Sequence, residues 1–319
     1  MSFVRESMRD RAAALAQAGI FIGTSSWKYP GWRGQLYDES RYVYHGRYAE
    51  SRFERNCLTE YAEVFKTVSV DAAYYQFPTP RYLEGLAGQV PSDFRFGFKV
   101  TELITLKRFP NLARFGPQAG DINEHFLNAE LFVSQFLQPC EAVRPHIGLL
   151  MFEFTRFQSR DMARGREFVE ALDRFLGQLP RNWPYGVEIR NASFLQPEYF
   201  ATLSRHGVAH IFNSWEAMPP IEEQLVLPGS LTSAELLGAR FLLRPGRRYE
   251  EAVKQFSPYQ RVQDPYPAGR VAGAKLLQLA RTRRPKNHAF LFINNRFEGN
   301  ALETITAILD EEQAETKNQ

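Results

Sequence analysis

Acidic and basic side chains share a face at the end of one apolar, strand-like run of this sequence. The run Tyr185–Arg190 reads Tyr-Gly-Val-Glu-Ile-Arg. Because side chains alternate along a strand, Glu188 and Arg190 point to one face and Val187 and Ile189 to the other. A buried carboxylate and guanidinium cost free energy unless they are paired or used on a ligand. Such a carboxylate can transfer protons, and such a guanidinium can bind an anion.

Polar groups recur at the ends of other strand-like runs. The ends carry Asp71, Lys99, Glu153, Glu188, Arg190, Asn213, Arg244, Asn294 and Asn295. If these faces point inward, three acids and three bases meet in one nearly neutral site. The alternative is that the charges pair with one another and simply close the top of the fold. We favour a ligand site, because the opposite strand ends carry no comparable set.

The loop after the first strand contributes aromatic side chains. Trp27, Tyr29 and Trp32 occur close together, with Gly31 and Gly34 between and beyond them, and Tyr75 follows the second strand. Aromatic faces stack on sugar rings or bases, and stacking on a base contributes ~1–3 kcal/mol. We therefore expect Trp27, Tyr29, Trp32 and Tyr75 to bind ligand; the alternative is that they are core.

Eight apolar runs alternate with helix-like segments. The predicted strands are Ile20–Thr24, Thr67–Asp71, Phe94–Val100, Ile147–Glu153, Tyr185–Arg190, Gly207–Asn213, Ala239–Arg244 and Ala289–Asn294. Eight such units predict an α/β fold, a single (β/α)8 TIM-type barrel with long loops after strands 1, 3 and 7. An open doubly wound sheet would also alternate, but no Gly-rich dinucleotide loop follows the first strand.

The whole chain is expected to form one domain. It comprises a lead-in helix (1–18), the barrel (19–309) and a disordered tail (310–319). The main predicted helices are Phe53–Phe65, Pro80–Val90, Ile122–Val143, Asp161–Gly177, Gln196–His206, Gly269–Arg281 and Asn300–Leu309, with an irregular segment from Pro245 to Pro267.

Composition excludes several functional classes. The chain has 319 residues, a net charge of +3 and two cysteines, with neither a signal-peptide pattern nor an apolar run of membrane-spanning length. We expect a cytoplasmic protein with reduced thiols. No GxxxxGK[ST], HExxH or CxxC motif occurs, and His206 and His210 are expected to be structural. No cofactor is predicted; a divalent ion weakly held by Asp71, Glu153 and Glu188 is left open.

Several blocks resemble one known family. They are Gly23–Gly34, Tyr61–Val68 leading to Tyr75 and Pro78, Phe94–Phe96 with Lys99, Val187–Arg190, and Ile293–Asn295 with Gly299–Ala301. Together they resemble the YecE-like proteins, known as domain of unknown function 72, over roughly Ile20 to Leu309. The resemblance implies a TIM-type barrel, and the family has no agreed activity.

The sequence departs from the family pattern at several positions. Ser69-Val70-Asp71 stands where the family tends to show Glu-Ile-Asn, and Glu153 stands where Gln is usual. Leu106 lies near a common His, and Arg244-Pro245-Gly246 replaces Leu-His-Gly. These departures indicate a divergent branch, to which a family activity need not transfer.

Three functions fit these features. The first is an enzyme, a hydrolase or isomerase, acting on a small anionic sugar-like or nucleoside-like ligand. Glu188 would be the acid or base, Lys99 and Glu153 would be catalytic partners, and Arg190 and Arg244 would hold the anion. Paired carboxylates could also cleave glycosides, but the many cations oppose a carboxylic acid.

The second function is nucleic-acid binding by two basic runs, which is less favoured because the net charge is small. One run holds Arg41, Arg47, Arg52 and Arg55 among tyrosines, and the other holds Arg281, Arg283, Arg284 and Lys286. The third is ligand binding without catalysis. The sequence does not decide whether the protein is an enzyme, and it assigns no oligomeric state.

Overall fold

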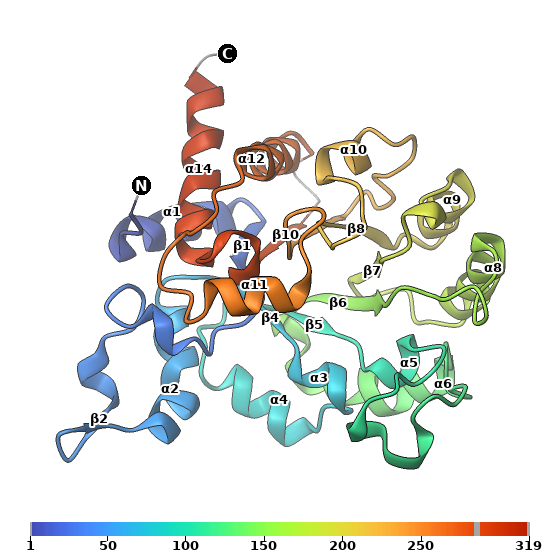
Figure 1. Cartoon of the computed structure of the whole chain (residues 1–319), viewed down its shortest axis with the longest axis horizontal. Helices are drawn as coiled ribbons and strands as arrows, with labels where there is room; N and C mark the ends of the chain where they lie inside the picture. Colours follow the sequence, from blue (N-terminus) through green and yellow to red (C-terminus); the bar gives the residue numbers. More distant parts are fainter. Residues whose placement is uncertain (1, 284–287, 318–319) are drawn as a thin grey trace.

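Eight parallel strands close into a barrel, as predicted. The computed structural model describes residues 2–283 and 288–317. The strands are β1 (Ile20–Thr24), β4 (Thr67–Val70), β5 (Arg95–Lys99), β6 (Ile147–Phe154), β7 (Tyr185–Ile189), β8 (Ala209–Asn213), β9 (Leu236–Phe241) and β10 (His288–Ile293). They pair in chain order, and β10 pairs with β1 to complete the circle (Figure 1). A short hairpin of β2 (Val43–Tyr44) and β3 (Arg47–Tyr48) stands outside the barrel.

Large apolar side chains fill the barrel interior. They are Phe21, Leu149, Met151, Ala209, Ile211, Leu236, Phe290 and Phe292. Glycines on neighbouring strands make room for them: a Cβ on Gly97 would lie 2.5 Å from the Phe292 ring. A Cβ on Gly238 would lie 2.3 Å from Ile211 Cδ1. The interior is therefore a packed core rather than a channel, and polar side chains are confined to its ends.

Helices cover the outside of the barrel. The longer ones are α1 (Arg5–Gln17), α2 (Glu50–Ala62), α4 (Pro80–Ala87), α8 (Gly165–Gly177), α9 (Pro197–His206), α11 (Tyr249–Phe256), α12 (Pro267–Thr282) and α14 (Ala301–Lys317). The lead-in helix α1 buries Met8, Ala12 and Leu15, and its Ala16 packs against the interior core. This helix thus helps to cover the amino-terminal opening.

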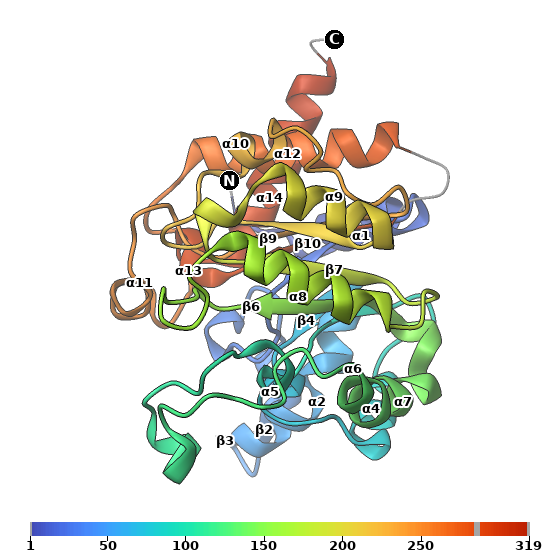
Figure 2. The same cartoon turned by 90° about the vertical axis from the view of Figure 1, so that its right-hand side faces the viewer.

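The loops that follow the strands lie at the opposite end. The short helices there include α3 (Ala72–Tyr75), α5 (Glu102–Thr105), α10 (Ile221–Leu225) and α13 (Asn295–Glu298). Figure 1 looks onto this end, and Figure 2 shows α11 and α13 together at the left edge of the barrel. No helix in residues 2–283 and 288–317 is long and apolar enough to cross a bilayer.

The structure corrects several predicted boundaries; α8, for example, begins at Gly165 rather than Asp161. Four differences concern larger segments. The seventh strand is Leu236–Phe241, so it begins three residues before the predicted Ala239. Apolar residues flank Arg240, the only charged residue of this strand, on both sides, and the sequence therefore marks neither end of the strand clearly. Helix α11 occupies part of the segment predicted to be irregular. Helix α14 continues through the predicted tail to Lys317, and residues 318–319 lie outside the described part of the chain.

The fourth error concerns the predicted helix Ile122–Val143. Helical structure begins only at α6 (Ala129–Phe132), because the Asn128 side chain caps it by accepting a hydrogen bond from the Leu131 backbone N–H. Leu127 has a φ of 55°, which interrupts a helix before this cap. The helical path then continues through a π-helical turn, Val133–Leu137, and α7 (Gln138–Cys140).

Candidate functional site

Five charged side chains meet at the carboxyl end of the barrel. They are Lys99 from β5, Glu153 from β6, Glu188 from β7, Arg190 directly after β7, and Arg240 from β9, and we call them the mouth cluster. Glu153, Glu188 and Arg240 have relative exposures of 3% or less. Lys99, Glu188 and Arg240 each come two residues after a glycine that faces the barrel interior, and Glu153 comes two residues after Met151. Arg190 in turn comes two residues after Glu188. Because side chains alternate along a strand, all five point inward.

One carboxylate oxygen is the centre of the mouth cluster. Glu153 Oε2 lies 2.9 Å from Lys99 Nζ, 2.9 Å from Arg190 Nη2 and 2.6 Å from Arg240 Nη1. The second carboxylate uses both of its oxygens. Glu188 Oε1 accepts a hydrogen bond from Arg190 Nε at 3.1 Å, and Oε2 accepts one from Arg240 Nη1 at 2.7 Å.

The charges of the mouth cluster determine its ionisation. Burial raises the pKa of Glu153, but Arg190, Lys99 and Arg240 outweigh burial and hold this pKa well below the ordinary value. Burial lowers the pKa of Arg240, while Glu188 and Glu153 raise it above its ordinary value. Glu153 is therefore ionised at neutral pH. By formal charge the three cations outnumber the two carboxylates of the cluster by one, and the Asp71 carboxylate beside Lys99 balances this difference.

A third carboxylate stands at the solvent edge of the mouth cluster. Asp71 Oδ1 lies 3.6 Å from Lys99 Nζ, and the Asp71 side chain is 41% exposed. Within the described chain, this buried Oδ1 atom has no hydrogen-bond partner, and neither do Ser69 Oγ and Arg240 Nε. Buried polar atoms usually have a partner, so the mouth has donor and acceptor capacity that the chain itself does not use.

Aromatic rings hold the two outer cations. The Arg190 guanidinium lies 3.8 Å from the Trp215 ring centroid, and Lys99 Nζ lies 4.1 Å from that of Tyr74. Both distances suit cation–π interactions. Burial, followed by the charge of Glu153, raises the pKa of Tyr74 above its ordinary value, so its phenol stays neutral.

A second aromatic group borders the same end of the barrel. Burial raises the pKa of Tyr29 to about 12; Arg296 opposes this rise and Asp71 adds to it. Both charges therefore act on the Tyr29 hydroxyl. Arg296 belongs to α13, directly after β10, and lies 4.5 Å from the Tyr249 ring centroid. Arg296 thus adds a cation to the rim of the mouth.

Three predicted amide residues stand at the strand ends but contact the backbone. Asn213 Nδ2 donates to the Ile189 carbonyl, and its Oδ1 accepts from the Trp215 N–H. Asn294 Oδ1 caps α13 at the Arg296 N–H, and Asn295 Oδ1 accepts from the Ala301 N–H. Their bonds indicate that they shape the loops around the mouth.

Other predicted residues lie apart from the mouth cluster. Arg244 is half exposed and pairs with Asp264, because the seventh strand ends earlier than predicted. Trp32 is fully buried and packs against Tyr29 and Tyr37 in the core. Tyr75 is 62% exposed beneath the Arg114 guanidinium. Trp27 is 7% exposed, and its Nε1 is one of the described buried atoms without a partner.

Sequence reasoning missed Arg240 and Arg296. Arg240 lies inside an apolar run, and the predicted strand Ala239–Arg244 placed the site residue at its end, Arg244. Alternation along this predicted strand places Arg240 on the same face as Arg244, so extending the inward face back along the strand could have found it. Arg296 follows Asn294 and Asn295, so the rule that site residues follow strand ends could have included it.

The histidines and carboxylates give no metal site within the described chain. No three His, Cys, Asp or Glu side chains converge there in a way that could hold an ion. His206 Nε2 contacts Asp173, and His210 Nδ1 contacts the Tyr199 hydroxyl behind the sheet. Cys57 and Cys140 are buried free thiols.

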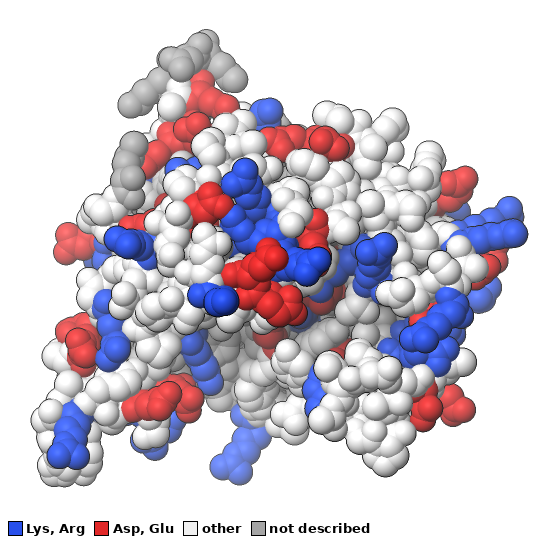
Figure 3. Space-filling model, in the orientation of Figure 1, with Lys and Arg blue, Asp and Glu red and all other residues white. Residues whose placement is uncertain are grey.

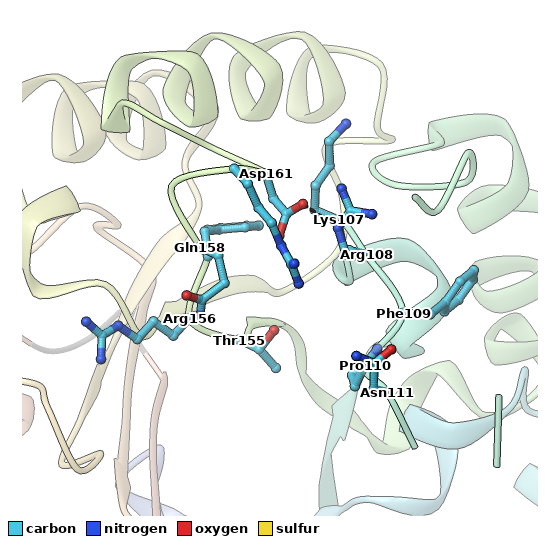
Figure 4. Close-up of a pocket in the computed structure, with 11 residues that line it drawn as sticks. Lys107, Arg108, Phe109, Pro110, Asn111, Thr155, Arg156, Gln158 and Asp161 are labelled. Carbon is cyan, nitrogen blue, oxygen red and sulfur yellow. Dashed lines mark hydrogen bonds and ion pairs between the residues drawn. The ribbon is translucent and has the colours of Figure 1, made fainter. Parts of the chain in front are cut away.

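A small basic cavity lies beside the mouth, between the loops that follow β5 and β6. Its volume is about 210 Å³, and its lining includes Lys107, Arg108, Arg156 and Asp161. Figure 4 shows Lys107 and Arg156 directed away from its centre. Arg108 Nε is bonded to Asp161 at 2.6 Å. These cations are thus either turned outward or already paired, so this cavity is a weaker anion site than the mouth cluster.

The surface around the mouth mixes both signs of charge. Figure 3 shows Lys and Arg side chains interspersed with Asp and Glu around α11 on this face. In the first basic run, Arg41 pairs with Glu63, and Arg52 donates to the Val43 carbonyl. In the second, Arg281 pairs with Glu312, while Arg284 and Lys286 lie outside the described residues.

The fold and the ion cluster define a TIM-barrel protein with a charged carboxyl-terminal mouth. The family model described as protein of unknown function DUF72 matches residues 21–319, and the chain belongs to this family. The UPF0759 protein YecE of Escherichia coli K12 is 27% identical over 183 residues, which is 57% of this chain and 50% of that protein. The aligned region thus spans only about half of this curated relative.

Two solved structures share the fold over nearly the whole chain. A DUF72 family protein (EF0366) from Enterococcus faecalis V583 has a TM-score of 0.62 and 17% identity, covering 92% of this chain and 95% of its own. Another (TM1631), from Thermotoga maritima MSB8, has a TM-score of 0.58 and 20% identity, covering 93% and 99%. At these identities the likeness shows the fold alone, and the predicted family resemblance is confirmed by the family model.

Proposed function

We propose that this protein is an enzyme, a hydrolase or isomerase, that binds a small anionic sugar-like or nucleoside-like ligand at the carboxyl-terminal mouth of its barrel. The main supporting observation is Asp71 Oδ1, which has no hydrogen-bond partner in the described chain and lies 3.6 Å from Lys99 Nζ at the edge of the mouth cluster. Clustered ionisable groups in barrel mouths are typical of functional sites.

Within this proposal, the two deeply buried carboxylates position the cations. Glu153 is ionised, and both carboxylates are ion-paired with Lys99, Arg190 or Arg240, so neither is free to act as a proton donor. This differs from the expectation that Glu188 acts as the acid or base. The proposed role of Glu153 and Glu188 is to hold the cations in fixed directions without reorganisation.

Lys99 and Arg190 are the proposed anion ligands, and Asp71 is the proposed proton-transfer group. Arg190 is fixed by two carboxylates and the Trp215 ring, which suits recognition of a phosphate or carboxylate. Asp71 is partly exposed and has an unused oxygen, so it can reach a substrate proton. Glycoside hydrolysis by paired carboxylates is less supported, because its acid must be protonated.

The test is binding of inorganic phosphate, followed by phosphorylated and carboxylated sugars and nucleosides, measured by isothermal titration calorimetry. Lys99→Met is expected to weaken phosphate binding at least ~10-fold, because it removes a charge-assisted hydrogen bond. The matched control is Arg244→Met, which removes a cation that pairs with Asp264 outside the mouth cluster.

Equal phosphate affinity in Lys99→Met and wild type would contradict the proposal. If Lys99→Met does not fold, Lys99→Arg keeps the charge with a different geometry. It is then expected to retain folding but to bind phosphate less tightly, and unchanged binding would count against the site.

A further inference from the structure

A larger cavity opens from the mouth toward the flank of the barrel, between α2 and α4. Its volume is about 680 Å³, and we call it the flank pocket. Figure 1 and Figure 2 both show α2 and α4 as neighbours on this side of the barrel. The pocket is lined from three sides, by the loop after β1, by α2 and by α4, and it reaches Asp71 at the end of β4.

The walls of the flank pocket are aromatic and apolar. Trp27, Tyr82, Leu58 and Leu86 contribute to its lining. Burial raises the pKa of Tyr82 to about 12, so its ring carries no charge at neutral pH. Such walls suit a planar ring, which gains both apolar burial and stacking.

The rim of the flank pocket is polar. Lys28, Arg55 and Arg81 supply cations, Glu54 supplies a carboxylate, and Gln89 supplies an amide with both a donor and an acceptor. Lys28 Nζ lies 5.8 Å from the Trp27 ring centroid, and Trp27 Nε1 has no partner in the described chain. A ligand with hydrogen-bonding edges around a flat ring can use these groups.

A glycine in α4 keeps the flank pocket open. Gly85 lines the pocket, and a Cβ placed on it would meet nothing within 4 Å. Within a helix, glycine costs about 1 kcal/mol relative to alanine, and neither a positive φ nor a close contact accounts for it here. An added side chain at this position would therefore extend into free space at the pocket.

We infer that the flank pocket binds the base of a nucleotide whose phosphate is held by Lys99 and Arg190. The pocket meets the mouth at Asp71, which is 3.6 Å from Lys99 Nζ, so one molecule can occupy both sites. Its volume exceeds what a phosphate or a single sugar needs, while the aromatic wall and polar rim match a base. This inference rests on the proposed function and assigns its substrate class.

The experiment compares adenosine 5′-monophosphate, ribose 5-phosphate and inorganic phosphate by isothermal titration calorimetry. The full chain is used as wild type, as Gly85→Leu and as Glu84→Leu. Glu84 is exposed on the same helix and is not part of the pocket lining, so its variant controls for an added leucine. Wild type and Glu84→Leu are expected to bind the nucleotide at least ~10-fold more tightly than ribose 5-phosphate.

Gly85→Leu is expected to lose this preference while it binds inorganic phosphate as wild type does. Equal affinity of wild type for the nucleotide and for ribose 5-phosphate would overturn the inference, as would unchanged nucleotide binding in Gly85→Leu. Lys99→Met distinguishes the two proposals. If it weakens phosphate binding while Gly85→Leu changes nothing, the anion site stands and the base pocket fails.

A total absence of phosphate and nucleotide binding would overturn both proposals. If Gly85→Leu fails to fold, Gly85→Ala replaces it, because alanine adds one carbon to free space and favours the helix. This variant is expected to weaken nucleotide binding by a smaller factor and to leave phosphate binding unchanged; identical nucleotide affinity would again count against the inference.

Discussion

Arg240 Nη1 lies 2.7 Å from Glu188 Oε2, and both side chains are almost completely buried. The same nitrogen also donates to Glu153 Oε2, so one guanidinium group links the two carboxylates across the top of the barrel. Desolvating such charges costs several kcal/mol per ion, and their attraction offsets this cost only if all partners stay in place. Arg240 is therefore the residue on which the remaining geometry of the mouth cluster most depends.

Replacing Arg240 is expected to destabilise the protein strongly. In Arg240→Met, Glu188 keeps only Arg190, and a buried carboxylate oxygen loses its donor. The free energy of unfolding should fall by about 3–5 kcal/mol, as measured by urea denaturation at pH 7. Arg244→Met is the control, and it should change the free energy of unfolding by less than about 1 kcal/mol, because Arg244 is half exposed. Similar losses in both variants would contradict the central role of Arg240.

The low pKa of Glu153 predicts that the free energy of unfolding falls at acidic pH. Burial raises this pKa, but Arg190, Lys99 and Arg240 lower it by a larger amount. The pKa of Glu153 in the folded protein therefore lies below the ordinary value of 4.5. The unfolded chain therefore binds the proton first. The stabilisation is fully present above pH 4.5 and is lost as pH falls toward the folded pKa. Glu153→Gln should lower stability at pH 7 and flatten its decline below pH 4.5 in urea titrations; an unchanged slope would contradict this.

The positions of Lys99, Glu153, Glu188 and Arg190 were predictable because each stands at the end of a clear strand. Parallel strands that alternate with helices bring their carboxyl ends together, so four members of the mouth cluster followed from local pattern alone. The pairing between them did not, because which cation meets which carboxylate depends on barrel register. Glu153 faces Glu188 across β6 and β7, and only the closed barrel shows that Arg240 comes between them.

Arg240 was missed because its local sequence has no alternation. The run Leu236–Phe241 is apolar on both faces apart from this arginine, since the outer face packs under helices and the inner face enters the barrel core. Such strands have no period-2 signal. Arg244 looked like the strand end for the same reason. The assignment of Trp32 as a site residue rested on composition, which does not tell a core aromatic from an exposed one.

His210 provides a second, independent pH effect, behind the sheet rather than in the mouth. Burial lowers its pKa from 6.5 to about 3, so the folded protein keeps it neutral. The unfolded chain takes up this proton below pH 6.5, and the stabilisation, complete above that value, is lost as pH falls toward 3. His210→Asn preserves an acceptor for the Tyr199 hydroxyl. When the pH is lowered from 7 to 5, the free energy of unfolding of this variant should fall by about 2 kcal/mol less than that of wild type, as measured by urea denaturation. The same fall in both proteins would contradict this.

Trp215 is expected to hold Arg190 in its binding direction. The guanidinium lies 3.8 Å from the ring centroid, an arrangement that contributes about 0.5–2 kcal/mol. Trp215→Ala should therefore weaken inorganic phosphate binding about 2- to 30-fold, as measured by calorimetry, while Trp215→Phe restores most of the affinity. If alanine and phenylalanine variants bind phosphate equally, the ring does not position Arg190.

Gly238 tests whether the barrel interior is as tightly packed as the structure shows. A Cβ there would lie 2.3 Å from Ile211 Cδ1, closer than two carbon atoms can approach, so Ile211 or the strand must shift. Gly238→Ala should lower the free energy of unfolding by about 1–3 kcal/mol. Gly85→Ala is the matched control, because the same added methyl group meets open space and favours the helix, and it should raise stability by about 0.5–1 kcal/mol. Ile211→Val in the Gly238→Ala background removes the contacting Cδ1 atom and should recover part of the loss. If both alanine variants are equally stable, the interior is less constrained around Ile211 than its contacts indicate.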